Sequence, residues 1–72
     1  MTKEQAIEKY ELLFGKADER LGFSLNACID KTGVEIEKWY SRNDFHCQLE
    51  DTVFIKNNGK VYRDGKEIKP KK

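Results

Sequence analysis

The sequence lacks the features that mark a secreted or membrane-spanning protein. None of its apolar runs approaches the roughly 20 residues that a bilayer span requires. The N-terminal stretch 1–5 lacks the apolar segment of a secretory signal. The two cysteines, Cys28 and Cys47, suffice for one disulfide, but a reducing compartment favours free thiols. We therefore expect a cytoplasmic protein with no membrane partner.

The sequence also lacks a large excess of charge of either sign. Fourteen basic and 13 acidic side chains give a formal net charge of +1, so the composition demands no polyanionic partner. The charge is uneven, however, because residues 51–72 carry seven basic and three acidic side chains. This excess favours an acidic partner, or it is a solvated, solubilising tail.

Catalytic and cofactor motifs are missing as well. Cys28, His46 and Cys47 are the only soft metal ligands, and none has zinc-site spacing. A nucleophilic Cys28 would need His46 within hydrogen-bond reach as its base, but an intervening strand is expected to separate the two residues. No glycine-rich loop followed by lysine is present to hold phosphates. We expect a protein that is not an enzyme, with no metal and no cofactor.

Helical periodicity is confined to the first part of the chain. Thr2 and Gln5 form a capping-box pattern, which predicts a helix start. Glycine is unfavourable inside a helix, so Gly15 favours an early end. We expect a helix within about 3–20, whose last residue lies between 14 and 20. One stripe of it is apolar: Ile7, Tyr10, Leu13, Phe14, Ala17 and Leu21.

Side chains alternate in polarity from Phe23 onward, which predicts strands. The segment 30–33 reads as a turn in which Gly33 takes a positive φ. The two flanking strands then pair with Ile29 opposite Val34, Ala27 opposite Ile36, Phe23 opposite Tyr40 and Leu25 opposite Lys38.

A polar break at 41–44 precedes another alternating stretch, 45–49, which predicts a third strand. A short helix capped by Asn43 is the alternative for this stretch. Glu50 and Asp51 are expected to form a tight turn into the next strand.

Two strong hairpin signals follow, Asn58-Gly59 and Asp64-Gly65. Two-residue turns at both sites predict that Ile55 pairs with Tyr62 and Val61 with Ile68. In this register Val53, Ile55 and Tyr62 share one face of the sheet. Pro70 lacks an amide donor and is expected to end the sheet, leaving a short basic tail at 70–72.

These elements together predict an α+β fold. We expect one compact domain over 1–72, with the N-terminal helix packed on an antiparallel β-meander of five to six short strands at about 23–69. A strongly twisted sheet that curls into a partly open barrel is a variant of this fold. The side chains expected under the helix are Phe23, Leu25, Ala27, Ile29, Val34, Ile36, Tyr40, Phe45, Cys47, Leu49, Phe54, Val61 and Ile68.

A single helix covers only one face of such a sheet, and the opposite face is predicted to carry apolar side chains too. An uncovered aromatic patch is typical of protein-binding surfaces. We therefore predict a protein-binding domain, as an adaptor or stoichiometric inhibitor of the kind that mobile genetic elements encode. The expected contact residues are Trp39, His46, Ile55 and Tyr62. Alternatively, Trp39 and Tyr62 join a second small core.

Two other binding functions stay open. Single-stranded nucleic acid is one, because aromatic side chains that stack on bases would lie beside a basic C-terminal region. Its expected contacts are Lys56, Lys60, Arg63, Lys66 and Lys69. Homodimerisation through the uncovered face, or through an edge strand, is the other.

Overall fold

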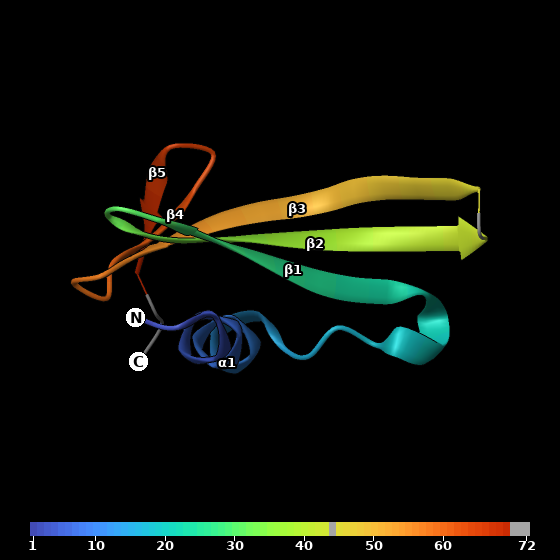
Figure 1. The fold of residues 1–72 in the computed structure, drawn as a ribbon, viewed down its shortest axis with the longest axis horizontal. Coiled ribbons are helices and arrows are strands. Elements are labelled where there is room, and N and C mark those ends of the chain that lie inside the picture. Colours follow the sequence, from blue (N-terminus) through green and yellow to red (C-terminus); the bar gives the residue numbers. More distant parts are fainter. Residues whose placement is uncertain (44, 70–72) are drawn as a thin grey trace.

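A computed structural model describes residues 1–43 and 45–69 and shows one N-terminal helix on a five-stranded antiparallel sheet (Figure 1). The strands follow one another in the order β1-β2-β3-β4-β5, which is a meander. The predicted α+β fold is thereby confirmed; Asp44 and the expected tail at 70–72 lie outside the described residues. The elements are α1 (Lys3–Phe14), the 3-10 helix η1 (Glu19–Leu21), β1 (Phe23–Asp30), β2 (Gly33–Asn43), β3 (His46–Lys56), β4 (Val61–Arg63) and β5 (Lys66–Ile68).

The local sequence determines where helix α1 begins and ends. The Thr2 hydroxyl accepts a hydrogen bond from the Gln5 amide at 3.1 Å, and Gln5 Oε1 accepts one from the Thr2 amide at 2.9 Å. This is the predicted capping box. The helix ends at Phe14, because Gly15 takes a φ of +89° that a continuing helix does not allow. The chain then passes through η1, which Asp18 caps, before it enters the sheet.

The first hairpin has the predicted register, with Ile29 opposite Val34 and Phe23 opposite Tyr40. The expected positive φ at Gly33 was wrong, because Gly33 itself pairs with Asp30 and begins β2. Its lack of a side chain serves a different purpose. A Cβ at Gly33 would lie 2.1 Å from the carbonyl oxygen of Ile55, so only glycine permits β3 to approach this closely.

Strand β3 runs without interruption from His46 to Lys56, so the predicted Glu50-Asp51 turn and the alternative short helix were wrong. Lys38 pairs with Asp51, whereas the next residue, Trp39, pairs with Leu49. Glu50 is therefore the extra residue of a β-bulge, which keeps the long hairpin paired while it shifts the alternation. For this reason the sheet has five strands and not six.

The hairpin at Asn58-Gly59 is wider than a two-residue turn. The Lys56 amide donates to the Lys60 carbonyl at 2.8 Å, and Ile55 pairs with Val61. The predicted pairing of Ile55 with Tyr62 was wrong by one residue. The next hairpin has the predicted register, Val61 opposite Ile68, with positive φ at both Asp64 and Gly65.

The core lies between α1 and the near face of the sheet, which we call the helix face. The one-residue shift turns Val53 and Ile55 toward the helix and Phe54 away from it. Four other side chains expected under the helix are not buried there: Ile29, Cys47 and Leu49 are exposed, and Phe45 is 91% exposed. In Figure 1 the β2–β3 hairpin extends well beyond α1, so α1 does not cover its far end, where the short helix η1 lies beside β1. The buried core consists of Ala6, Tyr10, Ala27, Val34, Ile36, Val53, Ile55 and Val61.

Candidate functional site

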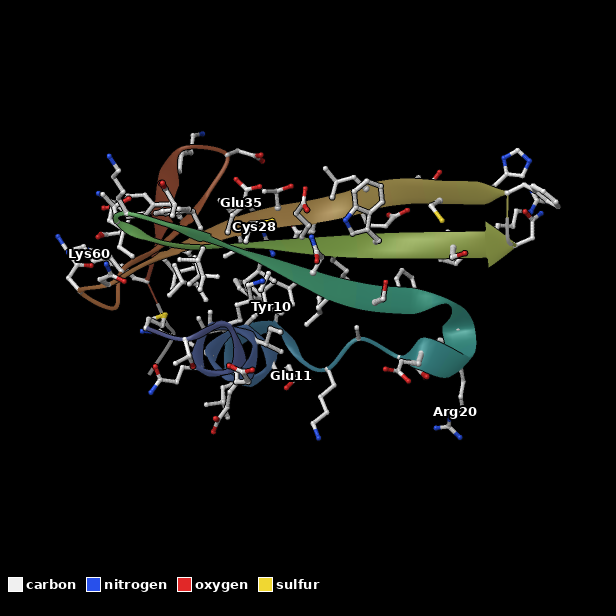
Figure 2. All side chains as sticks on the ribbon, viewed as in Figure 1. Tyr10, Glu11, Arg20, Cys28, Glu35 and Lys60 are labelled. Atoms are coloured by element: carbon white, nitrogen blue, oxygen red, sulfur yellow. The ribbon has the colours of Figure 1, made fainter. Side chains whose placement is uncertain are left out.

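The side of the sheet away from α1, which we call the outer face, is the candidate binding surface. Figure 2 shows Cys28 and Glu35 on this side, whereas Tyr10 lies between the sheet and the helix. Residues that pair across neighbouring strands lie on the same face, so the strand register identifies one row of outer-face residues that crosses all five strands. The row consists of Cys28, Glu35, Phe54, Tyr62 and Glu67.

Phe54 and Tyr62 form one apolar patch of the outer face. Both side chains are partly buried, and they lie beside each other on β3 and β4. The Lys56 ammonium lies 4.8 Å from the centre of the Tyr62 ring, a cation–π contact. The three side chains line a shallow hollow of about 370 Å³ that faces away from the helix.

Trp39 and Leu49 form a second apolar patch farther along the hairpin. Trp39 is four residues from Glu35 on β2, so it shares the outer face at a distance of about 13 Å along the strand. Leu49 pairs with Trp39 and is 47% exposed. The bulge at Glu50 is what turns Leu49 outward, since strict alternation from Val53 would turn it toward the helix.

Acidic side chains accompany these patches. Glu37 lies between Glu35 and Trp39 on the same face, and its carboxylate accepts a hydrogen bond from Asn26 Nδ2 at 3.1 Å. Glu67 pairs with Tyr62 at the end of the row, but its carboxylate lies 3.8 Å from Lys60 Nζ and lines the hollow beside α1, so it does not belong to this acidic group. Lys56 also lies on this face, where its cation–π contact with Tyr62 holds the ammonium beside the aromatic patch. The outer face therefore combines partly exposed apolar groups with the acidic side chains of Glu35 and Glu37.

The structure brings together only part of the predicted contact set. Trp39 and Tyr62 share the outer face, as their register requires. Ile55 does not, because it is 0% exposed in the core beneath the helix. His46 lies at the far end of the β2–β3 hairpin, opposite Asn43, and lines a different hollow of about 440 Å³ with Tyr40 and Arg42. The predicted arrangement of Trp39, His46 and Ile55 side by side was therefore wrong.

Leu49 and Phe54 were predicted to lie under the helix but lie on the outer face. Both assignments followed from assumed two-residue turns. For Phe54 the informative signal was the apolar pair Val53 and Ile55, which matches Ile36 and Val34 on β2. For Leu49 the signal was the uninterrupted length of β3, which requires a bulge and not a turn.

The five basic residues predicted to contact nucleic acid are divided between the two sides of the sheet. Lys56 lies on the outer face, whereas Arg63 lies on the helix face, with its guanidinium 4.5 Å from the centre of the Phe14 ring. Lys60 pairs with Glu67 at 3.8 Å. Lys66 and Lys69 are exposed at the ends of β5. The structure therefore gives these cations no single continuous surface.

Arg63 belongs to a polar network under the helix. Asp51 Oδ2 accepts hydrogen bonds from Arg63 Nη2 at 2.8 Å and from the Tyr10 hydroxyl at 3.2 Å. Burial, and then the negative charge of Asp51, raise the pKa of Tyr10 from 10.0 to about 12. Tyr10 is therefore neutral at ordinary pH and keeps the hydroxyl proton that it donates to Asp51. This hydrogen bond stabilises the packing of α1 on the sheet.

Neither cysteine is part of a disulfide. Cys28 and Cys47 are free and exposed on β1 and β3. Among residues 1–43 and 45–69, no three His, Cys, Asp or Glu side chains are grouped closely enough to hold a metal ion. Within the same residues, no helix has the length and apolar character that crossing a membrane requires.

Comparison with known proteins does not assign the chain to a family. No protein-family model, curated protein or solved structure matches it.

Proposed function

We propose that this chain is a small, non-enzymatic cytoplasmic domain that binds another protein through the outer face of its sheet. The observation that supports this function best is that four apolar side chains lie on the side of the sheet away from α1: Trp39, Leu49, Phe54 and Tyr62. Large aromatic and aliphatic side chains supply most of the energy of protein interfaces. The exposed free thiols of Cys28 and Cys47 suit a reducing compartment.

The charge of the outer face indicates the chemistry of the partner. Glu35 and Glu37 lie beside the apolar patches, and complementary interfaces place opposite charges around an apolar centre. The partner surface should therefore present apolar side chains flanked by lysine or arginine. A domain that covers such a surface acts as a stoichiometric inhibitor or an adaptor, the roles often filled by proteins of mobile genetic elements.

Capture of partners by matched variants tests the proposal. Leu49→Glu places a charge in the apolar patch, whereas Leu12→Glu makes the same change on the 80% exposed side chain of α1. We expect partners from the native cell to be lost with Leu49→Glu and retained with Leu12→Glu, with similar melting temperatures for both variants. Equal capture by both variants would contradict the proposal.

Single-stranded nucleic acid is the second candidate, and the hollow beside Phe54, Tyr62 and Lys56 is the observation that favours it. A base stacked on these rings would bring a phosphate near the lysine. Glu35, which pairs with Phe54 in the same row, opposes a phosphate backbone, which is why we rank this function second. Titration of labelled single-stranded DNA and RNA at two salt concentrations decides it, since absence of binding at low salt excludes it.

A further inference from the structure

A second surface, between α1 and the last hairpin, has the form of a ligand groove. Helix α1 and the last hairpin enclose a hollow of about 410 Å³, which is within the size range of sites for small ligands. Its apolar lining comes from Leu13 on α1, Val61 on β4 and Ile68 on β5. Val61 belongs to the core, and Leu13 and Ile68 pack against it, so the floor of the groove is continuous with the packed core.

Positive charge surrounds this apolar floor. Among the described residues, Lys9, Lys60 and Lys69 line the groove together with one carboxylate, that of Glu67. Lys60 Nζ lies 3.8 Å from Glu67 Oε1, an exposed ion pair that contributes little and is easily exchanged for another anion. The groove therefore has an excess of two positive charges, in contrast to the acidic outer face.

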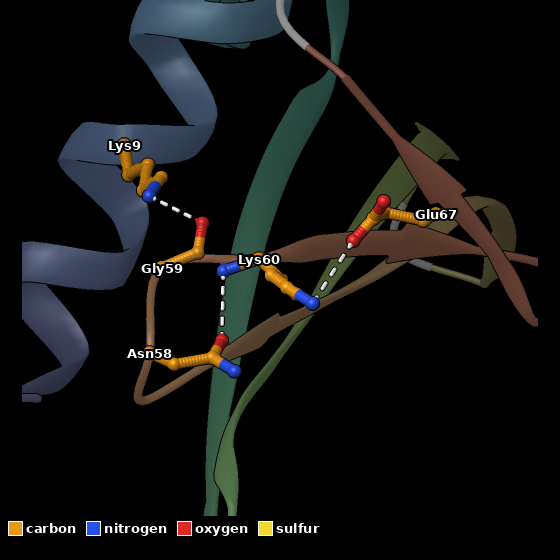
Figure 3. Close-up of polar contacts among 5 residues, drawn as sticks. All are labelled: Lys9, Asn58, Gly59, Lys60 and Glu67. Carbon is orange, nitrogen blue, oxygen red and sulfur yellow. Dashed lines mark hydrogen bonds and ion pairs between the residues drawn. The ribbon is translucent and has the colours of Figure 1, made fainter.

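Lys9 is held in place by a hydrogen bond within the protein. Figure 3 shows Lys9 Nζ donating a hydrogen bond to the Gly59 carbonyl, at 2.6 Å. The turn that presents this carbonyl is itself fixed, because Asn58 Oδ1 accepts a hydrogen bond from the Lys60 amide at 3.0 Å. A cation fixed in this way loses less conformational entropy when it binds an anion.

We propose that this groove binds a short acidic and apolar peptide segment of a partner protein. One or two aliphatic or aromatic side chains of the peptide would contact Leu13, Val61 and Ile68, and adjacent carboxylates would pair with the lysines. The aliphatic floor favours this occupant over nucleic acid, because the groove has no aromatic ring in its described lining on which a base stacks. The site is separate from the outer face and does not depend on the function proposed for it.

Titration with defined peptides, followed by NMR of the 15N-labelled protein, tests the inference. The probe is a decapeptide in which leucine and phenylalanine alternate with glutamate, and its control has lysine in place of every glutamate. We expect saturable shifts at the amides of Leu13, Val61 and Ile68 with the acidic peptide, at a Kd below about 1 mM. The basic peptide should leave these amides unchanged.

Matched charge variants give the second measurement. Lys9→Glu with Lys69→Glu should weaken the acidic peptide at least about tenfold, which is about 1.4 kcal/mol. Lys3→Glu with Lys16→Glu changes the net charge equally on exposed side chains outside the groove and should leave affinity unchanged. If the first variant is unfolded, Lys69→Glu alone, on an exposed side chain after β5, replaces it.

Four results would overturn the inference: no binding below about 1 mM, equal binding of the basic peptide, equal loss in both double variants, or shifts confined to the outer face. A single-stranded oligonucleotide that shifts the groove amides at lower concentration than the acidic peptide would also overturn it, in favour of a nucleic-acid site.

Discussion

The Tyr10 hydroxyl and Asp51 Oδ2 lie 3.2 Å apart and join the helix to the third strand by a hydrogen bond. The same oxygen accepts a hydrogen bond from Arg63 at 2.8 Å, so one carboxylate connects α1, β3 and β4. Asp51 was expected to form a turn; instead it is the residue on which the helix and the last strands converge.

Removal of this carboxylate should destabilise the protein. Asp51→Ala leaves the partly buried Arg63 and the buried Tyr10 without their shared acceptor, and we expect a loss of about 2 kcal/mol in the free energy of unfolding. Tyr10→Phe removes one hydrogen bond and should cost about 1 kcal/mol. Urea denaturation measures both. Asp30→Ala, on an exposed residue of β1, is the control and should change stability by less than about 0.5 kcal/mol.

The titration of Tyr10 should make stability fall at alkaline pH. Its pKa is raised by burial and by Asp51 from 10.0 to about 12, so the folded state retains a proton that the unfolded state releases between these values. The contribution is fully present below pH 10 and is lost as pH rises through 12, by up to about 3 kcal/mol. Urea denaturation at several values from pH 9 to 12 measures it. The difference between wild type and Tyr10→Phe isolates this group, and parallel curves would contradict the assignment.

Gly33 should tolerate no side chain. Gly33→Ala places a Cβ 2.1 Å from the Ile55 carbonyl oxygen and 2.8 Å from Lys56 Cα, both backbone atoms that cannot rotate away. We expect a loss of about 3 kcal/mol or failure to fold. Gly65→Ala has open space around its Cβ and should cost only about 1 kcal/mol, owing to its φ of +78°. Thermal denaturation of the two variants compares them, and equal costs would show that β2 and β3 separate to accept a methyl group.

The helix cap makes a smaller, separable contribution. Thr2→Ala removes the acceptor for the Gln5 amide and should cost about 1 kcal/mol. Thr32→Ala, an exposed turn residue, serves as the matched control. Thermal unfolding followed by far-UV circular dichroism at 222 nm, a wavelength characteristic of helix, records the difference between the two variants.

The two thiols report whether copies of the chain associate through the outer face. Cys28 and Cys47 are exposed, so both should react with a thiol reagent in the native protein without denaturant. If the chain forms homodimers through this face, Cys28 should become protected as protein concentration rises, and light scattering should show a growing mass. Rates independent of concentration, with a constant monomer mass, would exclude that alternative to the proposed function.

Interactions over short sequence distances were predictable from the sequence. The Thr2–Gln5 capping box, the β1–β2 register and the Asp64-Gly65 turn each depend on residues close together in the chain. Their geometry follows from backbone conformation and from the alternation of polar and apolar side chains. The α+β class followed from the change of periodicity at Phe23.

Tertiary structure decided which face of the sheet the later residues occupy. A shift of one residue reverses every side chain of a strand, and the Asn58-Gly59 signal does not specify whether two or three residues form the turn. Burial of Val53 and Ile55 against Val34 and Ile36 under the helix selects the wider turn, because their apolar surface is then removed from water. The bulge at Glu50 and the close approach at Gly33 likewise depend on β3 packing beside β2, which no local sequence signal contains. The sequence therefore determined the elements and their order, and packing against the helix determined the composition of both the core and the outer face.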